Sequence, residues 1–213
     1  MFNSDNLRLD GKCAIITGAG AGIGKEIAIT FATAGASVVV SDINADAANH
    51  VVDEIQQLGG QAFACRCDIT SEQELSALAD FAISKLGKVD ILVNNAGICK
   101  LNKVLDFGRA DWDPMIDVNL TAAFELSYEA AKIMIPQKSG KIINICSLFS
   151  YLGGQWSPAY SATKHALAGF TKAYCDELGQ YNIQVNGIAP GYYATDITLA
   201  TRSNPETNQR VLD

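Results

Sequence analysis

The feature that most limits the fold of this chain is an alternation of short, apolar, β-branched runs with longer stretches of helical periodicity. The apolar runs lie at residues 12–17, 37–41, 61–67, 89–95, 140–147 and 183–190. The helical stretches lie at 22–34, 45–58, 71–86 and 160–178, with a further long region that ends near residue 135. Strands that are apolar on both faces and separated by helices indicate a parallel sheet with helices on both sides. The sequence therefore predicts a doubly wound α/β fold of the Rossmann type, with three αβα layers and about six strands.

Glycines mark the expected ends of the helices. Gly35, Gly59, Gly87, Gly140 and Gly179 each stand where a helical stretch should stop and turn into a strand. The chain has 213 residues, of which 48% are hydrophobic, so it can bury one substantial core. We expect residues 1–213 to form a single domain.

The charge balance argues against two classes of partner. A formal net charge of −7 gives no basic field that would attract nucleic acid or anionic lipid. The first residues mix polar and charged side chains before any apolar run, unlike a secretory signal, and no apolar run is long enough to span a bilayer. We therefore expect a cytoplasmic protein with no nucleic-acid or membrane partner.

Cysteine and histidine give no sign of a metal site. The two histidines, His50 and His165, have no neighbouring ligand at metal-binding spacing. None of the six cysteines forms a C-x-x-C pair, and most lie in or beside apolar runs. We expect no bound metal and two histidines on helix surfaces. We also expect mostly buried free thiols, at Cys13, Cys65, Cys67, Cys99, Cys146 and Cys175.

A glycine-rich turn, TGAGAGIG at residues 17–24, follows the first apolar run and leads into a helix. Glycines let the backbone approach a pyrophosphate, whose charge is met by the N–H groups and dipole at the helix N-terminus. The second apolar run is followed by Asp42, near the spacing expected for an acid that binds the adenosine ribose hydroxyls. A carboxylate there repels a 2′-phosphate, so NAD is favoured over NADP. The alternative for Asp42 is a solvated surface aspartate.

Tyr160 and Lys164 lie four positions apart on a predicted helix, and therefore on the same face. If the cofactor expected at the glycine-rich turn oxidises an alcohol, a base must take up the hydroxyl proton as hydride leaves carbon. A tyrosine, with a pKa of about 10, needs a nearby cation to do this at neutral pH. The pair fits a general base and the lysine that stabilises its phenolate. The alternative is two residues on a solvated helix face.

The chain resembles the short-chain dehydrogenase/reductase family over nearly its whole length. The family pattern T-G-x-x-x-G-x-G is met at residues 17–24, N-N-A-G at 94–97 and Y-x-x-x-K at 160–164, in the family's order. The resemblance implies a catalytic set in which Ser147 binds the substrate oxygen and Asn119 organises a relay water, beside Tyr160 and Lys164. It also implies a cofactor site made of Thr17, Gly18, Gly22, Ile23, Gly24, Asp42, Asp68, Asn95, Ala96, Gly97, Tyr160, Lys164, Pro190, Gly191 and Thr195. Asp68 is expected at the adenine, and residues 190–195 at the nicotinamide carboxamide.

The two halves resemble different enzymes of this family. Residues 1–97 are similar to bacterial 7α-hydroxysteroid dehydrogenases, and residues 98–213 to 2-deoxygluconate and ketodeoxygluconate dehydrogenases. This split suggests an engineered chimera. The substrate pocket of such folds lies beyond the carboxyl ends of the later strands. We therefore expect the second half to set the substrate, a sugar acid or its keto form.

The resemblance also implies a shortened C-terminus, because family members continue with a further helix and a seventh strand. The functional hypothesis is an NAD-dependent oxidoreductase that interconverts a secondary alcohol and a ketone. A homodimer or higher homo-oligomer is expected through the helices that carry Asn119 and Tyr160. Two alternatives remain open: a folded NAD-binding scaffold with little or no catalysis, and retained 7α-hydroxysteroid dehydrogenase activity.

Overall fold

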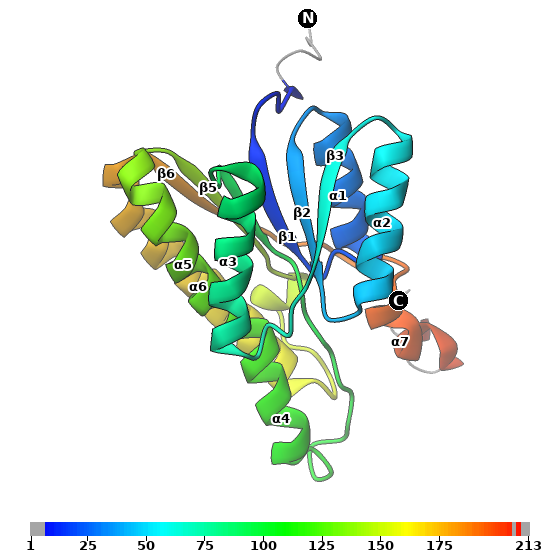
Figure 1. The fold of residues 1–213 in the computed structure, drawn as a ribbon. Coiled ribbons are helices and arrows are strands. Elements are labelled where there is room, and N and C mark those ends of the chain that lie inside the picture. Colours follow the sequence, from blue (N-terminus) through cyan, green and yellow to red (C-terminus); the bar gives the residue numbers. More distant parts are fainter. Residues whose placement is uncertain (1–6, 206–207, 210–213) are drawn as a thin grey trace, which may run out of the picture.

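A computed structural model describes residues 7–205, 208 and 209, and its core is a parallel sheet of six strands. The strand order is β3-β2-β1-β4-β5-β6, so the chain builds one half of the sheet and then crosses over to build the other (Figure 1). The strands are β1 (Cys13–Thr17), β2 (Ser37–Asp42), β3 (Gln61–Arg66), β4 (Ile91–Asn94), β5 (Gly140–Ile145) and β6 (Ile183–Ile188). The predicted doubly wound α/β fold is confirmed. The single domain predicted for residues 1–213 includes positions 1–6, 206–207 and 210–213, which lie outside the described residues.

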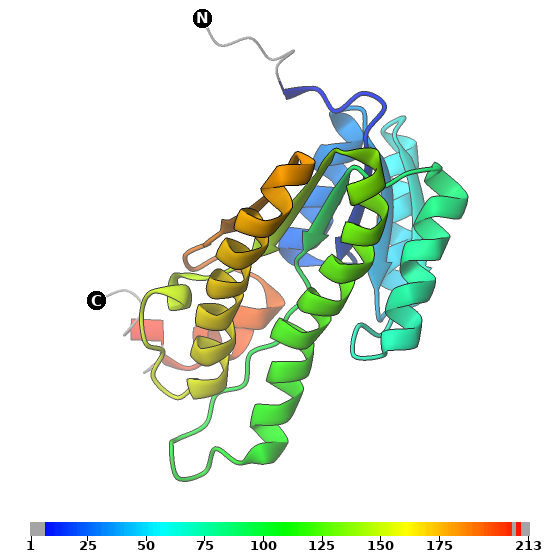
Figure 2. The same ribbon diagram turned by 90° about the vertical axis from the view of Figure 1, so that its left-hand side faces the viewer.

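Helices cover both faces of the sheet because the strands carry apolar side chains on both faces. Ile16 and Val38 pack with α1 and α2, whereas Ile15 and Val39, one residue away, pack with α3, α5 and α6 on the other face. Figure 2 looks onto this second helical layer. The helices are α1 (Gly22–Thr33), α2 (Ala45–Gln57), α3 (Glu72–Leu86), α4 (Arg109–Ile116), α5 (Ala122–Gln137), α6 (Pro158–Leu178) and α7 (Leu199–Ser203).

Glycine ends only some of the helices. Gly87 caps α3 in the left-handed conformation (φ 76°), and Gly59 follows α2 at φ 82°, as predicted. As predicted, the chain passes from helix to strand near Gly140 and near Gly179, but neither glycine makes the turn. Gly140 lies inside β5, where a Cβ would collide with Met134, and Gly179 keeps a right-handed backbone. At Gly140 the glycine is required by close packing and not by the end of a helix.

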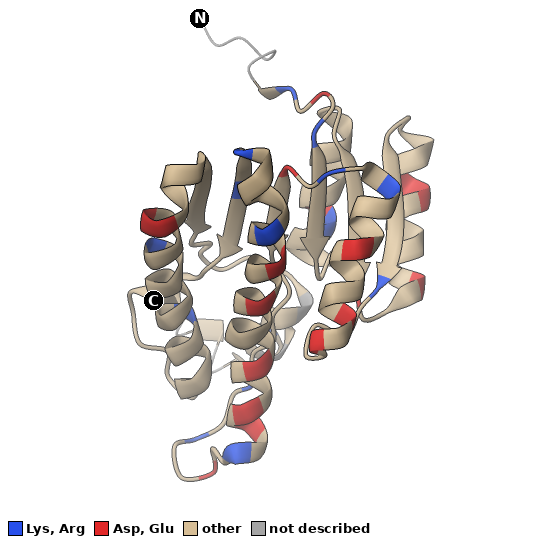
Figure 3. Ribbon diagram, turned by 60° about the vertical axis from the view of Figure 1, so that its left-hand side comes forward, with Lys and Arg blue, Asp and Glu red and all other residues tan. Residues whose placement is uncertain are grey.

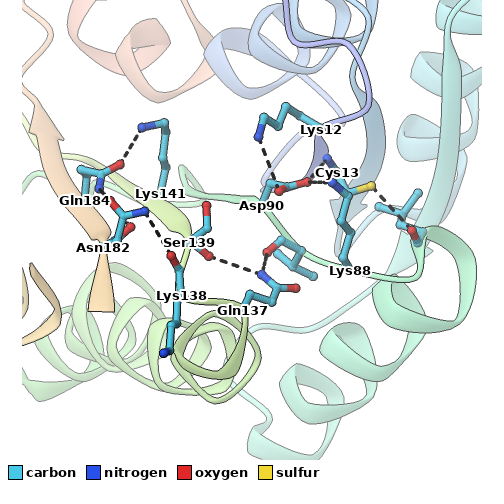
Figure 4. Close-up of polar contacts among 12 residues, drawn as sticks. Lys12, Cys13, Lys88, Asp90, Gln137, Lys138, Ser139, Lys141, Asn182 and Gln184 are labelled. Atoms are coloured by element: carbon cyan, nitrogen blue, oxygen red, sulfur yellow. Dashed lines mark hydrogen bonds and ion pairs between the residues drawn. The ribbon is translucent and has the colours of Figure 1, made fainter. Parts of the chain in front are cut away.

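Lys138 and Asn182 make those two turns instead, at φ 50° and 59°. The Asn182 side-chain amide donates to the Lys138 carbonyl (3.1 Å), so each turn supports the other (Figure 4). In the same region the Asp90 carboxylate accepts the N–H of Cys13 (2.9 Å) and pairs with Lys88 (3.0 Å). These contacts fasten β1, β4, β5 and β6 together at the amino end of the sheet, which leaves the carboxyl end for a site.

The long helix predicted to end near residue 135 is interrupted. Residues 98–108 are not helical, and α4 joins α5 through a π-helical turn at Asp117–Thr121. Asn119 lies within this wider turn and is buried. Acidic residues recur along α4 and α5 (Figure 3). Burial, with repulsion from Glu72 and Asp117, raises the pKa of Glu125.

The cysteine and histidine side chains lie largely where the sequence predicts. All six thiols are free, and Cys175 differs from the prediction in being exposed. His50 and His165 lie on the surfaces of α2 and α6. Within the described part of the chain, no helix is both long enough and apolar enough to span a membrane.

Candidate active site

A cleft of about 370 Å³ opens at the carboxyl ends of the strands. Because all six strands are parallel, the loops that follow them converge on this one edge of the sheet. The predicted residues that line the cleft are Gly18, Gly22, Ile23, Asp42, Asp68, Asn95, Ala96, Gly97, Ser147, Tyr160, Lys164, Pro190, Gly191 and Thr195. Three predicted residues, Thr17, Gly24 and Asn119, are not among its lining.

The glycine-rich turn forms one wall of the cleft. Gly18 and Gly22 adopt positive φ angles of 59° and 54°, and a Cβ on Gly18 would lie 2.8 Å from the Cα of Ala96. α1 begins directly behind this turn, and its N-cap residue, Ala21, provides no side-chain hydrogen bond. An anion in the cleft can therefore accept from the first N–H groups of the helix. These residues fit the pyrophosphate of a dinucleotide.

Thr17 and Gly24 support this wall from beneath. The Thr17 hydroxyl oxygen accepts from the backbone N–H groups of Asn95 and Ala96 (3.1 Å each). The Asn95 side-chain amide donates back to the carbonyls of Thr17 (2.9 Å) and Gly18 (3.1 Å). A Cβ on Gly24 would collide with the Gly18 carbonyl. Thr17 holds the ends of β1 and β4 together, and Gly24 lets α1 pack closely against them, so both residues contribute to the site indirectly.

Asp42 and Asp68 lie in the part of the cleft that follows β2 and β3. The Asp42 carboxylate accepts the N–H groups of Gly20 and Asn44, both at 2.9 Å, which fixes its orientation. Hydrogen bonds from the Thr70 side chain and backbone lower the pKa of Asp68. Two fixed acidic groups therefore lie at this end of the cleft, where a phosphate would be repelled.

Ile43 and Ile69 line the cleft beside these acids, and sequence reasoning missed them. Ile43 directly follows Asp42 after β2, and Ile69 directly follows Asp68 after β3. The Ile43 side chain is largely exposed (62%). A large apolar side chain after each strand-end acid was the available signal. Such a pair offers apolar walls for a flat ring such as adenine.

The serine, tyrosine and lysine predicted as catalytic meet at the other end of the cleft. Ser147 lies just after β5, and Tyr160 and Lys164 lie on the first turns of α6. The Lys164 ammonium donates to the carbonyl of Ile145 (2.7 Å) and lies 5.6 Å from the centroid of the Tyr160 ring. Ser147 and Lys164 are buried, and Tyr160 is partly exposed to the cleft.

The electrostatics of this group differ from the sequence prediction. Burial raises the pKa of Tyr160, and a hydrogen bond with Ser147 is what lowers it in opposition. Burial also lowers the pKa of Lys164 to about 8. Desolvation is the largest effect on Tyr160 and raises its pKa, opposite in direction to the lowering predicted from Lys164. Ser147 is the group that directly favours the phenolate.

Asn119 fixes the backbone next to the lysine. Its side chain accepts the N–H of Ile98 (2.8 Å) and donates to the carbonyl of the same residue (2.9 Å). It also donates to the Thr163 hydroxyl (3.3 Å), which lies on α6 beside Lys164. The π-helical turn thus ties the loop after β4 to α6.

An aromatic cluster next to Tyr160 was also missed. The Phe149 ring meets Tyr160 edge-on (centroids 6.0 Å apart) and Tyr192 edge-on (6.2 Å). The N–H of Leu148 donates to the carbonyl of Pro190 (3.1 Å), which draws the two loops together. No motif joins these residues, because the contact forms between loops that follow different strands.

Comparison with known proteins places the chain among relatives of two kinds. The uncharacterized oxidoreductase YgcW of Escherichia coli (strain K12) is 70% identical over 212 residues, covering 100% of this chain and 81% of the relative. The 5-keto-D-gluconate 5-reductase of the same strain is 40% identical over 92% of this chain and 78% of its own length. A solved structure of 7 alpha-hydroxysteroid dehydrogenase with NADH and 7-oxo glycochenodeoxycholic acid has a TM-score of 0.93 and 61% identity. It covers 99% of this chain and 82% of that one.

These matches bear on the predicted split of the chain. YgcW and the hydroxysteroid dehydrogenase structure each match both halves, so the predicted chimera gains no support from them.

The family model for short chain dehydrogenases matches residues 12–206, which include the glycine-rich turn and the serine, tyrosine and lysine of the cleft. The chain belongs to the short-chain dehydrogenase/reductase family and is an oxidoreductase acting on CH–OH groups.

Proposed function

We propose that this protein is an NAD-dependent oxidoreductase that interconverts a secondary alcohol and a ketone, with Tyr160 as the acid and base. The observation that carries the proposal is the convergence of Ser147, Tyr160 and Lys164 at one end of a cleft. The glycine-rich turn and Asp42 lie elsewhere along the same cleft, so one dinucleotide could contact both groups.

NAD is proposed over NADP because of Asp42. Its carboxylate is oriented by two backbone N–H groups and keeps acceptor capacity for the two hydroxyls of a ribose. A 2′-phosphate would bring further negative charge against it. The nearby Asp68 adds a second acidic group to this end of the cleft.

The residues of this chain would move one proton in each direction. When bound, the nicotinamide ring supplies or accepts the hydride. In reduction, the Tyr160 hydroxyl gives its proton to the carbonyl oxygen as the alcohol forms. In oxidation, the phenolate takes the proton from the alcohol. Ser147 donates a hydrogen bond to the phenolate oxygen of Tyr160, and the buried Lys164 ammonium adds electrostatic stabilisation of the same phenolate.

Two substrate classes are candidates. The sequence prediction, a sugar acid, is supported by the likeness to 5-keto-D-gluconate 5-reductase. A specific observation favours an apolar cyclic ketone. Among the described residues that line the cleft, Lys164 is the one cationic side chain, and it already serves Tyr160. The rings of Phe149 and Tyr192, which are not among the residues that line the cleft, add apolar surface next to the phenol. We propose the apolar cyclic ketone first and the sugar acid second.

We also propose a homodimer through α5 and α6. Phe124 and Tyr128 on α5 are about half exposed, at 47% and 52%, and Phe170 on α6 meets Phe124 edge-on (6.1 Å). Exposed aromatic side chains that cluster on two helices favour association. The cytoplasm is the proposed compartment, because all six thiols are unpaired.

The test of the function is a substrate panel with the purified protein. NAD or NADP is mixed with 7-hydroxysteroids and with gluconate derivatives, and absorbance of the reduced cofactor is followed. The proposal expects turnover with NAD on at least one alcohol of the panel. Binding of NADH, seen by fluorescence, without any turnover would instead support the non-catalytic scaffold.

A further inference from the structure

The short 3₁₀ turn after β5, Leu148–Ser150, contains a serine that no sequence pattern singles out. Ser150 is only 5% exposed. Its hydroxyl donates to the carbonyl of Lys164 (2.8 Å), and its oxygen accepts the backbone N–H of Ser147 (3.2 Å). One side chain therefore joins the loop that carries the catalytic serine to the helix that carries the catalytic lysine.

We propose that Ser150 is a positioning residue, which holds Ser147 in register with Tyr160 and Lys164 for proton transfer; the inference rests on the proposed function. Tyr160 and Lys164 lie one turn apart on α6, so a bond to the Lys164 carbonyl fixes the helix face that carries both. The hydrogen bond that the Ser147 N–H donates to the Ser150 oxygen fixes the position of Ser147. A small displacement between such groups is costly in rate, because proton transfer requires hydrogen-bond distance.

The same turn directs the proton of Ser147. The backbone N–H of Phe149 donates to the Ser147 hydroxyl oxygen (3.2 Å) and so occupies one of its acceptor sites. A hydroxyl has a single proton, which remains available for the Tyr160 oxygen. The hydrogen bond between Ser147 and Tyr160 lowers the phenol pKa against the effect of burial. Loss of the Ser150 tether would loosen the turn and weaken that bond.

Ser150→Ala tests the proposal, with Thr171→Val as a matched control. The Thr171 hydroxyl also donates to a carbonyl, that of Leu167 (2.7 Å), and accepts one N–H, from the Asn144 side chain (2.9 Å). Thr171 is buried on α6, the helix that carries Lys164, and both variants lose one donated and one accepted hydrogen bond. Any general cost to stability should therefore appear in both.

The expected result is a separation of rate from binding. Ser150→Ala should lower kcat about 10-fold, with the Kd for NADH unchanged, whereas Thr171→Val should lose melting temperature and keep kcat. An unchanged kcat in Ser150→Ala would overturn the proposal. An equal loss of kcat in Thr171→Val would do so too. If Ser150→Ala does not fold, Ser150→Cys, which keeps the size with a weaker donor, should show a loss of about 3-fold.

A second readout does not need turnover. Ultraviolet difference titration of the protein against Tyr160→Phe reports the phenol of Tyr160, and Ser150→Ala should raise its apparent pKa by about one pH unit. The titratable neighbours, Lys164, Cys99, Cys146 and Tyr192, are the same in both proteins. An unchanged titration in folded Ser150→Ala contradicts the positioning role. Absence of turnover in the unmodified protein contradicts the proposed function alone.

Discussion

The two halves of the molecule prepare their contacts in different ways. In residues 1–97 the expected cofactor contacts depend on backbone geometry, as at Gly18 and Gly22, and on Asp42, whose carboxylate is held by two N–H groups. In residues 98–213 the expected catalytic positions depend on side chains: Ser150 holds the N–H of Ser147 and donates to the carbonyl of Lys164, whose ammonium donates to the carbonyl of Ile145. The cofactor wall of the first half is set by backbone conformation and backbone N–H groups, whereas the expected proton-transfer geometry of the second half is set by side-chain hydrogen bonds between the loop after β5 and α6.

The strongest test of this contrast is Tyr160→Phe. Loss of the hydroxyl removes the proton donor and acceptor, so kcat should fall by about 10²–10⁴-fold. The first half is untouched, and NADH should bind with unchanged affinity. Steady-state rates and cofactor fluorescence measure the two quantities. Tyr181→Phe, at a partly buried tyrosine outside the cleft, is the control and should keep full activity. Comparable activity of the two variants would refute the assigned role of Tyr160.

Asp42→Ala tests the first half of the molecule, because it changes an expected cofactor contact and leaves Ser147, Tyr160 and Lys164 intact. The ribose hydroxyls lose their acceptor, so kcat/KM with NAD should fall about 10–100-fold, whereas the value with NADP should hold or rise. The ratio of the two values, measured with one substrate, gives the preference directly. Asp46→Ala removes an exposed acid from the first turn of α2 and should leave the ratio unchanged. If the Asp42→Ala variant still prefers NAD over NADP to the same degree, another residue sets the cofactor preference.

The sequence predicted the first half in more detail than the second. Predicted and observed ends of α1 and α2 agree within one residue, because apolar periodicity and turn residues specify them locally. The interruption of α4 and α5 at Asp117–Thr121 was not foreseen, since a π-helical turn has no distinct periodicity over so few residues. The Tyr160–Lys164 pair was predicted, and the structure places both residues at the cleft.

What could not be predicted were contacts made across the fold. The Lys164 ammonium donates to the carbonyl of Ile145, so it lies farther from the phenol than spacing along the helix suggests. The Phe149 ring, in the turn after β5, packs against Tyr160 on α6 and against Tyr192 in the loop after β6. Such contacts depend on how neighbouring strands end, which no single segment of sequence specifies.

The burial of Lys164 has a measurable consequence for stability. Its pKa is lowered from 10.5 to about 8, so below that pH folding must bury an ammonium that the unfolded chain keeps in water. The penalty is complete below about pH 8 and shrinks as pH rises towards the unfolded pKa, because the unfolded state then binds more protons. Between about pH 7 and pH 10 the protein should gain about 2 kcal/mol relative to Lys164→Met.

Urea unfolding of both proteins at the two pH values measures this gain. Lys172→Met removes an exposed lysine from the same helix and corrects for the general effect of pH on α6. A constant difference between the protein and Lys164→Met across this range would mean that the ammonium is solvated in the folded state. The catalytic end of the cleft would then be wetter than its 4% exposure at Lys164 indicates.

The smallest expected effects compare one glycine from each half. A Cβ added at Gly59 or at Gly169 meets no atom within 4 Å, so packing does not distinguish the two substitutions. Backbone conformation does: Gly59 has φ 82°, and Gly169 lies within α6 with no positive φ. Gly59→Ala should lower the free energy of unfolding by about 1 kcal/mol. Gly169→Ala should raise it by about 0.5–1 kcal/mol, because alanine loses less backbone entropy on folding. Opposite signs in urea unfolding are the expected result. Equal signs would show that context other than local backbone geometry controls one of the two positions.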